Sequence, residues 1–128
     1  MVGIDIVEVK RIKELNKDGR LEQRILSTRE QEYLSKKSIN VVPGKIYSEK
    51  DNSLAGFWAS KEAVLKALGI GINNVNLKEV EILHKSSGEP YGEVSEKIWK
   101  FAGKKPAKNI KISVSHDAGL AVSVCFLS

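Results

Sequence analysis

The sequence predicts a single α+β domain over residues 1–128, in which a mostly antiparallel sheet packs against a long central helix and several short helices. Apolar residues alternate near both ends of the chain, which is typical of strands. One uninterrupted helical pattern covers residues 54–68. A chain of 128 residues with 41% hydrophobic and 29% charged residues has the composition of a globular protein and the length for one core.

An N-terminal strand is predicted because Val2, Ile4 and Ile6 alternate with Gly3 and Asp5. The side chain of Asp5 is therefore expected to point away from this apolar set. Short helices follow, and Arg20 and Arg24 share a face of one of them because they are four residues apart. These helices are expected at residues 9–16, around Leu21 and Ile25, and from the capping box Ser27–Glu30 to Leu34.

The long helix is predicted to end at Gly69, a residue type that favours helix C-termini. Lys61 lies near the middle of its apolar face, so its ammonium group must extend to solvent, pair with a carboxylate or face an interface. Residues 38–52 precede this helix and show little periodicity, so they are predicted to form a loop. The apolar face is formed by Leu54, Phe57, Val64, Leu65 and Leu68.

The C-terminal half is expected to contain three strands, an extended piece and one helix. A strand over 77–83 is followed by a turn at 86–90 and a short extended segment at Tyr91. A helix over 94–102 is expected to turn Ile98 and either Phe101 or Ala102 inward. Alternating residues over 110–115 and 120–126 then predict a hairpin that turns at 116–119.

The net charge of +5 is unevenly distributed along the chain. Residues 10–37 hold nine basic and five acidic side chains, and residues 97–111 hold six lysines and no acid. Such segments suggest a polyanionic partner, although a solvated surface explains them equally well. A nucleic acid is one candidate, but aromatic residues make up only 6% and no RNA-binding signature is present.

The single cysteine, Cys125, excludes an intramolecular disulfide and a cysteine-based zinc site. No apolar run approaches the roughly 20 residues that span a bilayer, and no secretory signal is visible at the N-terminus. A cytoplasmic protein without a membrane partner is therefore expected.

Four residues are candidates for chemistry. Glu62 and Lys66 are four apart, which also suits a simple surface ion pair. Asp5 and His116 would by themselves be ordinary polar-face and turn residues. Taken together, two carboxylates, a lysine and a histidine suggest a metal–phosphate site, because Mg²⁺ is held by one or two carboxylates plus phosphate oxygens and water.

Two stretches of the sequence carry a family resemblance. The segment Val2-Gly3-Ile4-Asp5 and the segment Trp58–Lys66, with the pattern W-x-S-K-E-A-x-x-K, resemble the two signature stretches of the 4′-phosphopantetheinyl transferases. The chain length and the closing segment Ile112–Asp117 are similar to the short, single-domain branch, the holo-[acyl-carrier-protein] synthases. The similarity covers residues 2 to about 34, resumes at about 54 and continues weakly to the C-terminal hairpin.

The resemblance implies a phosphopantetheinyl transferase fold and a reaction. Asp5 and Glu62 would bind Mg²⁺ at the pyrophosphate of coenzyme A. A serine of apo acyl carrier protein would attack the β-phosphate, and adenosine 3′,5′-bisphosphate would leave, an activity that supports fatty acid biosynthesis. Lys66 would neutralise phosphate charge. Glu62, acting directly or through a water molecule, is the first candidate for the base, and His116 is the second or else binds a phosphate.

The resemblance also implies partners. Arg11, Arg20 and Arg24 match the basic surface that docks the acidic acyl carrier protein. Gly69 and Gly71 match a stretch where the backbone approaches the cofactor, although Gly69 as a plain helix cap is equally consistent. The family further implies a homotrimer with active sites at subunit interfaces, which would give Lys61 an interface to face.

Two features depart from the family pattern: Phe57 stands where many relatives have arginine, and residues 38–52 form a longer segment than the short branch predicts. The alternatives are a small basic nucleic-acid-binding domain that uses the lysines of residues 97–111, and a catalytically inactive interaction domain. The presence of both Asp5 and Glu62 argues against the second.

Overall fold

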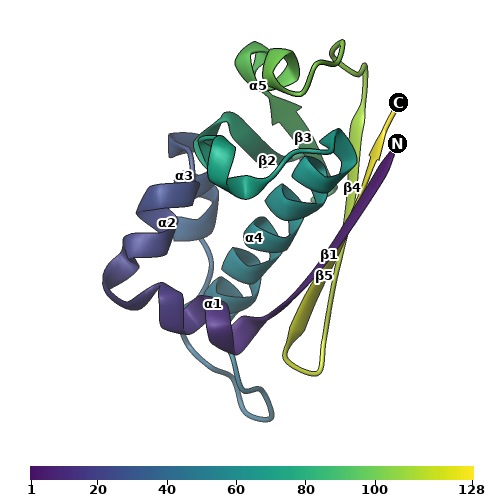
Figure 1. Ribbon diagram of the computed structural model, residues 1–128. Coiled ribbons are helices and arrows are strands. Elements are labelled where there is room, and N and C mark those ends of the chain that lie inside the picture. Colours follow the sequence, from purple (N-terminus) through teal and green to yellow (C-terminus); the bar gives the residue numbers. More distant parts are fainter.

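An antiparallel sheet packs against one long helix, α4, which confirms the predicted α+β arrangement (Figure 1). The sheet has five strands in the order β1-β5-β4-β3-β2. The computed structural model describes residues 1–128. The long strands β1, β5 and β4 lie together, whereas β3 joins β4 through the single pair Tyr91–Lys111. The strands are β1 (Val2–Glu8), β2 (Val80–His84), β3 (Pro90–Val94), β4 (Ile110–Asp117) and β5 (Leu120–Leu127).

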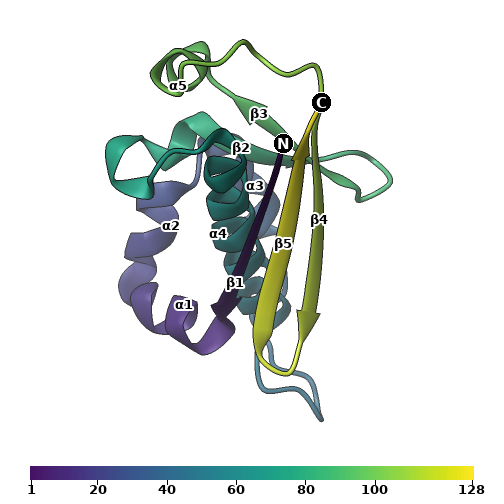
Figure 2. The ribbon, with the colours of Figure 1, turned by 45° about the vertical axis from the view of Figure 1, so that its right-hand side comes forward.

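Three short helices lie on the side of α4 that is remote from the long strands (Figures 1 and 2). No helix of the chain combines the length and the apolar character that a bilayer crossing requires. The helices are α1 (Val9–Leu15), α2 (Arg20–Ile25), α3 (Thr28–Ser35), α4 (Glu49–Leu68) and α5 (Glu96–Phe101), with short 3₁₀ helices at Lys17–Gly19, Ile72–Asn74 and Leu77–Glu79.

Helix α4 begins five residues before its predicted start, so the prediction of a loop over 38–52 was wrong at its C-terminal end. The side chain of Ser48 accepts a hydrogen bond from the backbone N–H of Asp51, and the Asp51 carboxylate accepts one from the N–H of Ser48. This capping box starts the helix with a polar first turn, in which apolar residues do not recur at helical spacing. The predicted C-terminus at Gly69 (φ 74°) and the predicted capping box of α3, Ser27 with Glu30, are both confirmed.

The apolar alternation of β1 faces away from the core of the chain. Val2, Ile4 and Ile6 are 57%, 59% and 58% exposed, whereas Gly3 and Val7 are buried against α4. β5 has the same arrangement, because Ala121, Ser123 and Cys125 are fully buried and Phe126 is exposed. The strands are where the sequence predicts them, and Asp5 does point away from the apolar set, toward α4.

Close packing of backbones explains why the inner face of β1 carries a small residue. A Cβ atom added at Gly3 would lie 1.9 Å from the carbonyl oxygen of Ala63 and 2.6 Å from the backbone nitrogen of Ala67. Both alanines are buried, and so is Ala59 one turn earlier on the same helix. β1 therefore crosses α4 with almost no side-chain layer between them, which brings Asp5 close to the helix.

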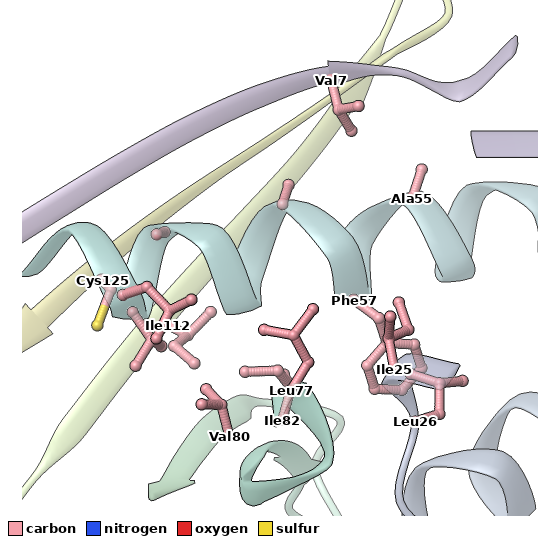
Figure 3. Close-up of a cluster of buried hydrophobic side chains, with 14 of the residues drawn as sticks. Val7, Ile25, Leu26, Ala55, Phe57, Leu77, Val80, Ile82, Ile112 and Cys125 are labelled. Atoms are coloured by element: carbon pink, nitrogen blue, oxygen red, sulfur yellow. The ribbon is translucent and has the colours of Figure 1, made fainter. Parts of the chain in front are cut away.

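The core extends along α4 (Figure 3). Val7 of β1 lies on one side of the helix, whereas Leu77, Val80 and Ile82 lie on the other. In the C-terminal half, the 3₁₀ helix Leu77–Glu79 precedes β2, so the strand begins three residues later than predicted. Helix α5 turns Ile98 inward as predicted, and the second buried residue is Trp99. Phe101 is 55% exposed, so the prediction that it could be the second inward residue was wrong.

Lys61 is completely buried inside the chain and pairs with a carboxylate. Its Nζ atom donates to Glu30 Oε1 at 2.8 Å and to the carbonyl oxygens of Leu77 and Val80 at 2.7 and 2.6 Å. Burial lowers the pKa of Lys61, and the negative charge of Glu30 opposes that shift. The expectation that a subunit interface accommodates Lys61 is therefore wrong, because all three partners belong to its own chain.

Candidate active site at the crossing of β1 and α4

Three of the predicted site residues meet where β1 crosses α4. Asp5 lies on the face of β1 that is turned toward the helix, and Glu62 and Lys66 lie one turn apart on the helix. The Nζ atom of Lys66 donates to Asp5 Oδ1 at 3.0 Å and to the carbonyl oxygen of Ile4 at 3.0 Å. No salt bridge joins Glu62 to Lys66, so the simple ion pair on the helix surface is not what forms.

Glu62 is half-buried and sits in the field of several charges. Burial raises the pKa of its carboxyl group, and the negative charge of Asp5 raises it further, while Lys66 and Arg11 act in the opposite direction. The carboxylates of Asp5 and Glu62 are therefore close enough to repel each other. A cation placed between them would relieve this repulsion.

The donor set suits a hard divalent cation. No group of three or more His, Cys, Asp or Glu side chains is arranged to hold a metal ion. Two carboxylates without nitrogen or sulfur donors match Mg²⁺, which keeps several waters and binds substrate phosphates. They do not match a structural zinc site, which needs four protein ligands.

A cavity of about 600 Å³ adjoins Glu62 and has basic and apolar walls. Arg11 and Arg24 line it, are exposed and form no salt bridge; Arg20 is likewise exposed and unpaired but lies outside the cavity. The prediction from sequence did not include several of the apolar residues that line it. Those residues are Trp58, Ile72, Val75 and Leu77, of which only Trp58, one turn before Glu62, stood out in the sequence.

His116 lies elsewhere within the chain. Its Nε2 atom donates a hydrogen bond to the carbonyl oxygen of Asn52 at 2.8 Å, because a carbonyl oxygen can only accept. Asn52 precedes Glu62 by ten residues, which corresponds to about 15 Å along the axis of α4. His116 lines a different cavity, of about 550 Å³. One chain therefore does not bring His116 to Glu62.

The cavity beside His116 has an aromatic wall. The rings of Tyr33 and His84 stack with their centroids 3.9 Å apart, and Phe57 packs edge-on against both. Nδ1 of His84 is buried without a hydrogen-bond partner, and burial lowers the pKa of this histidine. Phe57, at a position where the sequence departs from the expected family pattern, belongs to the core and is only 3% exposed.

The two glycines after Lys66 differ in conformation. Gly69 has a φ of 74°, and its backbone N–H caps α4 by bonding the carbonyl oxygens of Leu65 and Lys66. Gly71 is extended, with a φ of −89°. The cap accounts for glycine at position 69, and a contact between either glycine and a cofactor stays a prediction.

Comparisons with known proteins identify the family. The family model for the 4′-phosphopantetheinyl transferase superfamily matches residues 1–125. The chain is 40% identical over 124 residues to the holo-[acyl-carrier-protein] synthase of Caldanaerobacter subterraneus subsp. tengcongensis, covering 96% of this chain and 90% of the relative. It is 39% identical over 130 residues to that of Campylobacter hominis, covering 99% and 96%.

A solved structure gives the same result. The crystal structure of the Helicobacter pylori holo-[acyl-carrier-protein] synthase in complex with coenzyme A is 30% identical in sequence, covers 100% of both chains and superposes with a TM-score of 0.79. The resemblance that the segments Val2–Asp5 and Trp58–Lys66 carry is thus confirmed over nearly the whole chain. The chain belongs to the 4′-phosphopantetheinyl transferase superfamily.

Proposed function

We propose that this chain transfers the 4′-phosphopantetheine group of coenzyme A to a serine of apo acyl carrier protein, at the site formed by Asp5, Glu62 and Lys66. One observation carries the proposal: both signature stretches of the family, far apart in the sequence, meet where Lys66 bonds Asp5. The names of the relatives and the complex of the Helicobacter pylori enzyme with coenzyme A support the same reaction.

The reaction needs a base and a means of neutralising phosphate charge. The serine oxygen forms a bond to the β-phosphorus, the bond from that phosphorus to the bridging oxygen breaks, and adenosine 3′,5′-bisphosphate leaves. Glu62 takes the serine proton, either directly or through a water molecule, because it is the carboxylate at the edge of the cavity. Lys66, whose side chain is half exposed, reaches a phosphate oxygen from its position beside Asp5.

Asp5 and Glu62 are the residues that would hold Mg²⁺. When bound, the ion supplies positive charge to the pyrophosphate of coenzyme A. Burial is the main cause of the raised pKa of Glu62, and the negative charge of Asp5 adds to it; this mutual repulsion of the two carboxylates favours a cation between them. Lys66 offsets only part of this repulsion, because its side chain is largely in contact with solvent.

The basic rim of the cavity beside Glu62 fits an acidic carrier. Arg11, Arg20 and Arg24 are unpaired and exposed, so their charges are free to attract carboxylates of a partner. The apolar wall of the cavity that Arg11 and Arg24 line offers contact area next to the proposed base, and Arg20 extends the basic surface beyond it. A carrier docked on this rim presents its serine close to Glu62.

We further infer a homotrimer with active sites between subunits. The exposed apolar face of β1, with Phe126 beside it, is the kind of surface that another copy of the chain covers. Glu62 and His116 line separate cavities of one chain, and an interface can join these cavities. Such an interface places the ring of His116 from one subunit beside a phosphate of coenzyme A held at Glu62 and Gly69 of its neighbour.

The test is transfer by the purified chain with coenzyme A, Mg²⁺ and an apo acyl carrier protein, followed by mass spectrometry of the carrier. The carrier is expected to gain one phosphopantetheine, and chelation of the metal is expected to stop the gain. Glu62→Gln should lower kcat by about 100-fold or more while the protein stays folded.

A matched control separates loss of chemistry from loss of charge. Glu32 is exposed on α3 and has no partner, so Glu32→Gln should keep the wild-type rate. Absence of transfer by the wild-type chain would contradict the proposed function. A wild-type rate for Glu62→Gln would contradict the role assigned to that carboxylate.

A further inference from the structure

The site formed by Asp5, Glu62 and Lys66 does not involve the basic segment over residues 97–111. Its first part forms α5, where Lys97 is exposed and makes no salt bridge, and Phe101 is 55% exposed. Lys97 and Phe101 line a small hollow of about 110 Å³. Val75 and Asn76 line this hollow and also the cavity beside Glu62, so the two surfaces are continuous.

The surface that a bound carrier protein covers must be larger than the cavity beside Glu62. Twelve residues line the cavity beside Glu62, whereas a specific complex involves about 20–30 residues on each side. A carrier seated on the arginine rim must therefore also cover neighbouring surface. Across Val75 and Asn76, that neighbouring surface is α5.

Of the two lysines on α5, Lys97 is the one that forms no salt bridge. Glu96 pairs with Lys100 at 3.4 Å, and Glu79, on the other side of the hollow, accepts a hydrogen bond from the Ser95 hydroxyl at 3.2 Å. Lys97 lines the same hollow as Glu79 and forms no salt bridge. The remaining lysines lie further along the chain, where Lys104 and Lys105 line a separate hollow near the chain termini.

We propose that α5 is a second contact for the acidic carrier protein, in which Lys97 pairs with a carboxylate of the carrier and Phe101 packs on an apolar side chain. The proposal rests on the proposed function and extends it by naming a further part of the docking surface. A nucleic acid fits this surface less well, because binding along a phosphate backbone needs a continuous basic track and Glu79 and Glu96 interrupt it.

The test is steady-state kinetics of Lys97→Glu and Phe101→Ala, with the carrier and coenzyme A varied in turn. Both residues are exposed, so both variants are expected to fold, which thermal denaturation checks. Lys97→Glu should raise the KM for the carrier about fivefold, with a weaker salt dependence of that KM, and should leave kcat and the KM for coenzyme A unchanged. Phe101→Ala should raise the same KM without altering its salt dependence.

Lys108→Glu is the matched control, because Lys108 is an exposed lysine of the same segment that lines neither hollow. It should behave as wild type. An unchanged KM for the carrier in both α5 variants, or an equal rise in Lys108→Glu, would overturn the proposal while transfer itself remains intact. Binding of a short duplex DNA or RNA that Lys97→Glu abolishes, together with an unchanged KM for the carrier, would assign α5 to nucleic acid instead.

Discussion

Lys61 and Glu30 form an ion pair from which water is excluded. Both oxygens of the Glu30 carboxylate are occupied: Oε1 accepts from the Ser27 N–H and from Lys61, and Oε2 accepts from the Ile82 N–H. A buried charge left without its partner is costly, about 3–5 kcal/mol. The pair therefore ties α3 and β2 to the helix that carries Glu62.

The sequence restricted the environment of Lys61 to three possibilities but did not identify its partner. An apolar helix face makes any lysine on it conspicuous, so the need for a carboxylate or an interface was predictable. Glu30 already had a local role in the capping box of α3, and its position 31 residues earlier gives no periodic signal. Which carboxylate reaches Lys61 depends on how α3 packs against α4, which is a tertiary property.

Glu81 gives a prediction about acid stability. Arg29 donates to both of its carboxylate oxygens, at 2.6 and 3.1 Å, and these bonds together with that of the Ser27 hydroxyl lower the pKa of Glu81 below its ordinary value of 4.5. A lowered carboxyl pKa stabilises the fold above the unfolded pKa, and this stabilisation is lost as the pH falls through the folded pKa. Glu81→Gln should therefore lose less unfolding free energy than wild type between about pH 5 and pH 3.

Urea denaturation at a series of pH values measures this difference. Glu32→Gln is the control, because Glu32 is exposed and unpaired. Unfolding free energies of Glu81→Gln that run parallel to wild type over the whole acid range would show that the interaction between Arg29 and Glu81 contributes nothing to acid sensitivity. The Arg29 side chain is 57% exposed, so added salt should shrink the effect.

At the scale of elements, periodicity located most of the helices and strands, and the errors have identifiable causes. Helix α4 begins with five residues that carry no apolar period, so only the capping box of Ser48 and Asp51 marked its start. In β1, a period of two shows that Val2, Ile4 and Ile6 share a face but not which face is covered. The covered face is the one with Gly3, because only there does the backbone of α4 fit.

Gly3→Ala tests this close approach. The added methyl group would meet backbone atoms of Ala63 and Ala67, which cannot turn aside as a flexible side chain can. Overpacking typically costs about 1–3 kcal/mol, and a clash with backbone belongs at the upper end. The unfolding free energy should fall accordingly, and kcat should fall as well, because β1 must move and carries Asp5 with it.

Chemical denaturation and the transfer assay measure these two effects. Gly71→Ala is the structural control, because a Cβ there would be 3.8 Å from its nearest neighbour and the backbone has a negative φ. Wild-type stability of Gly3→Ala would mean that β1 and α4 can separate without cost. That result would remove the explanation for glycine in the Gly3-Ile4-Asp5 stretch.

At the scale of the whole molecule, the candidate site is divided between two regions of the surface. Asp5, Glu62 and Lys66 were predicted together from the family signature, and the fold brings them together because β1 crosses the second half of α4. His116 was predicted for the same site, yet it bonds the first turn of α4, in a separate cavity. The sequence could not predict this separation, because a sequence motif does not show whether two residues of one site come from the same subunit or from two subunits.

Complementation between variants tests whether the two regions join in an assembly. Glu62→Gln and His116→Ala, each with little activity alone, should regain activity when co-expressed or mixed after dissociation. With random mixing, about one interfacial site in four holds both wild-type residues if each comes from a different subunit.

Ile4→Glu should place a charge on the exposed face of β1, reduce the assembly to monomers in sedimentation and abolish transfer, although Ile4 makes no contribution to the buried core. Mixed variants that stay as inactive as each alone, although sedimentation shows that they form the proposed trimer, would show that Glu62 and His116 do not act at one interfacial site. A fully active monomeric Ile4→Glu would show that a single chain suffices for catalysis.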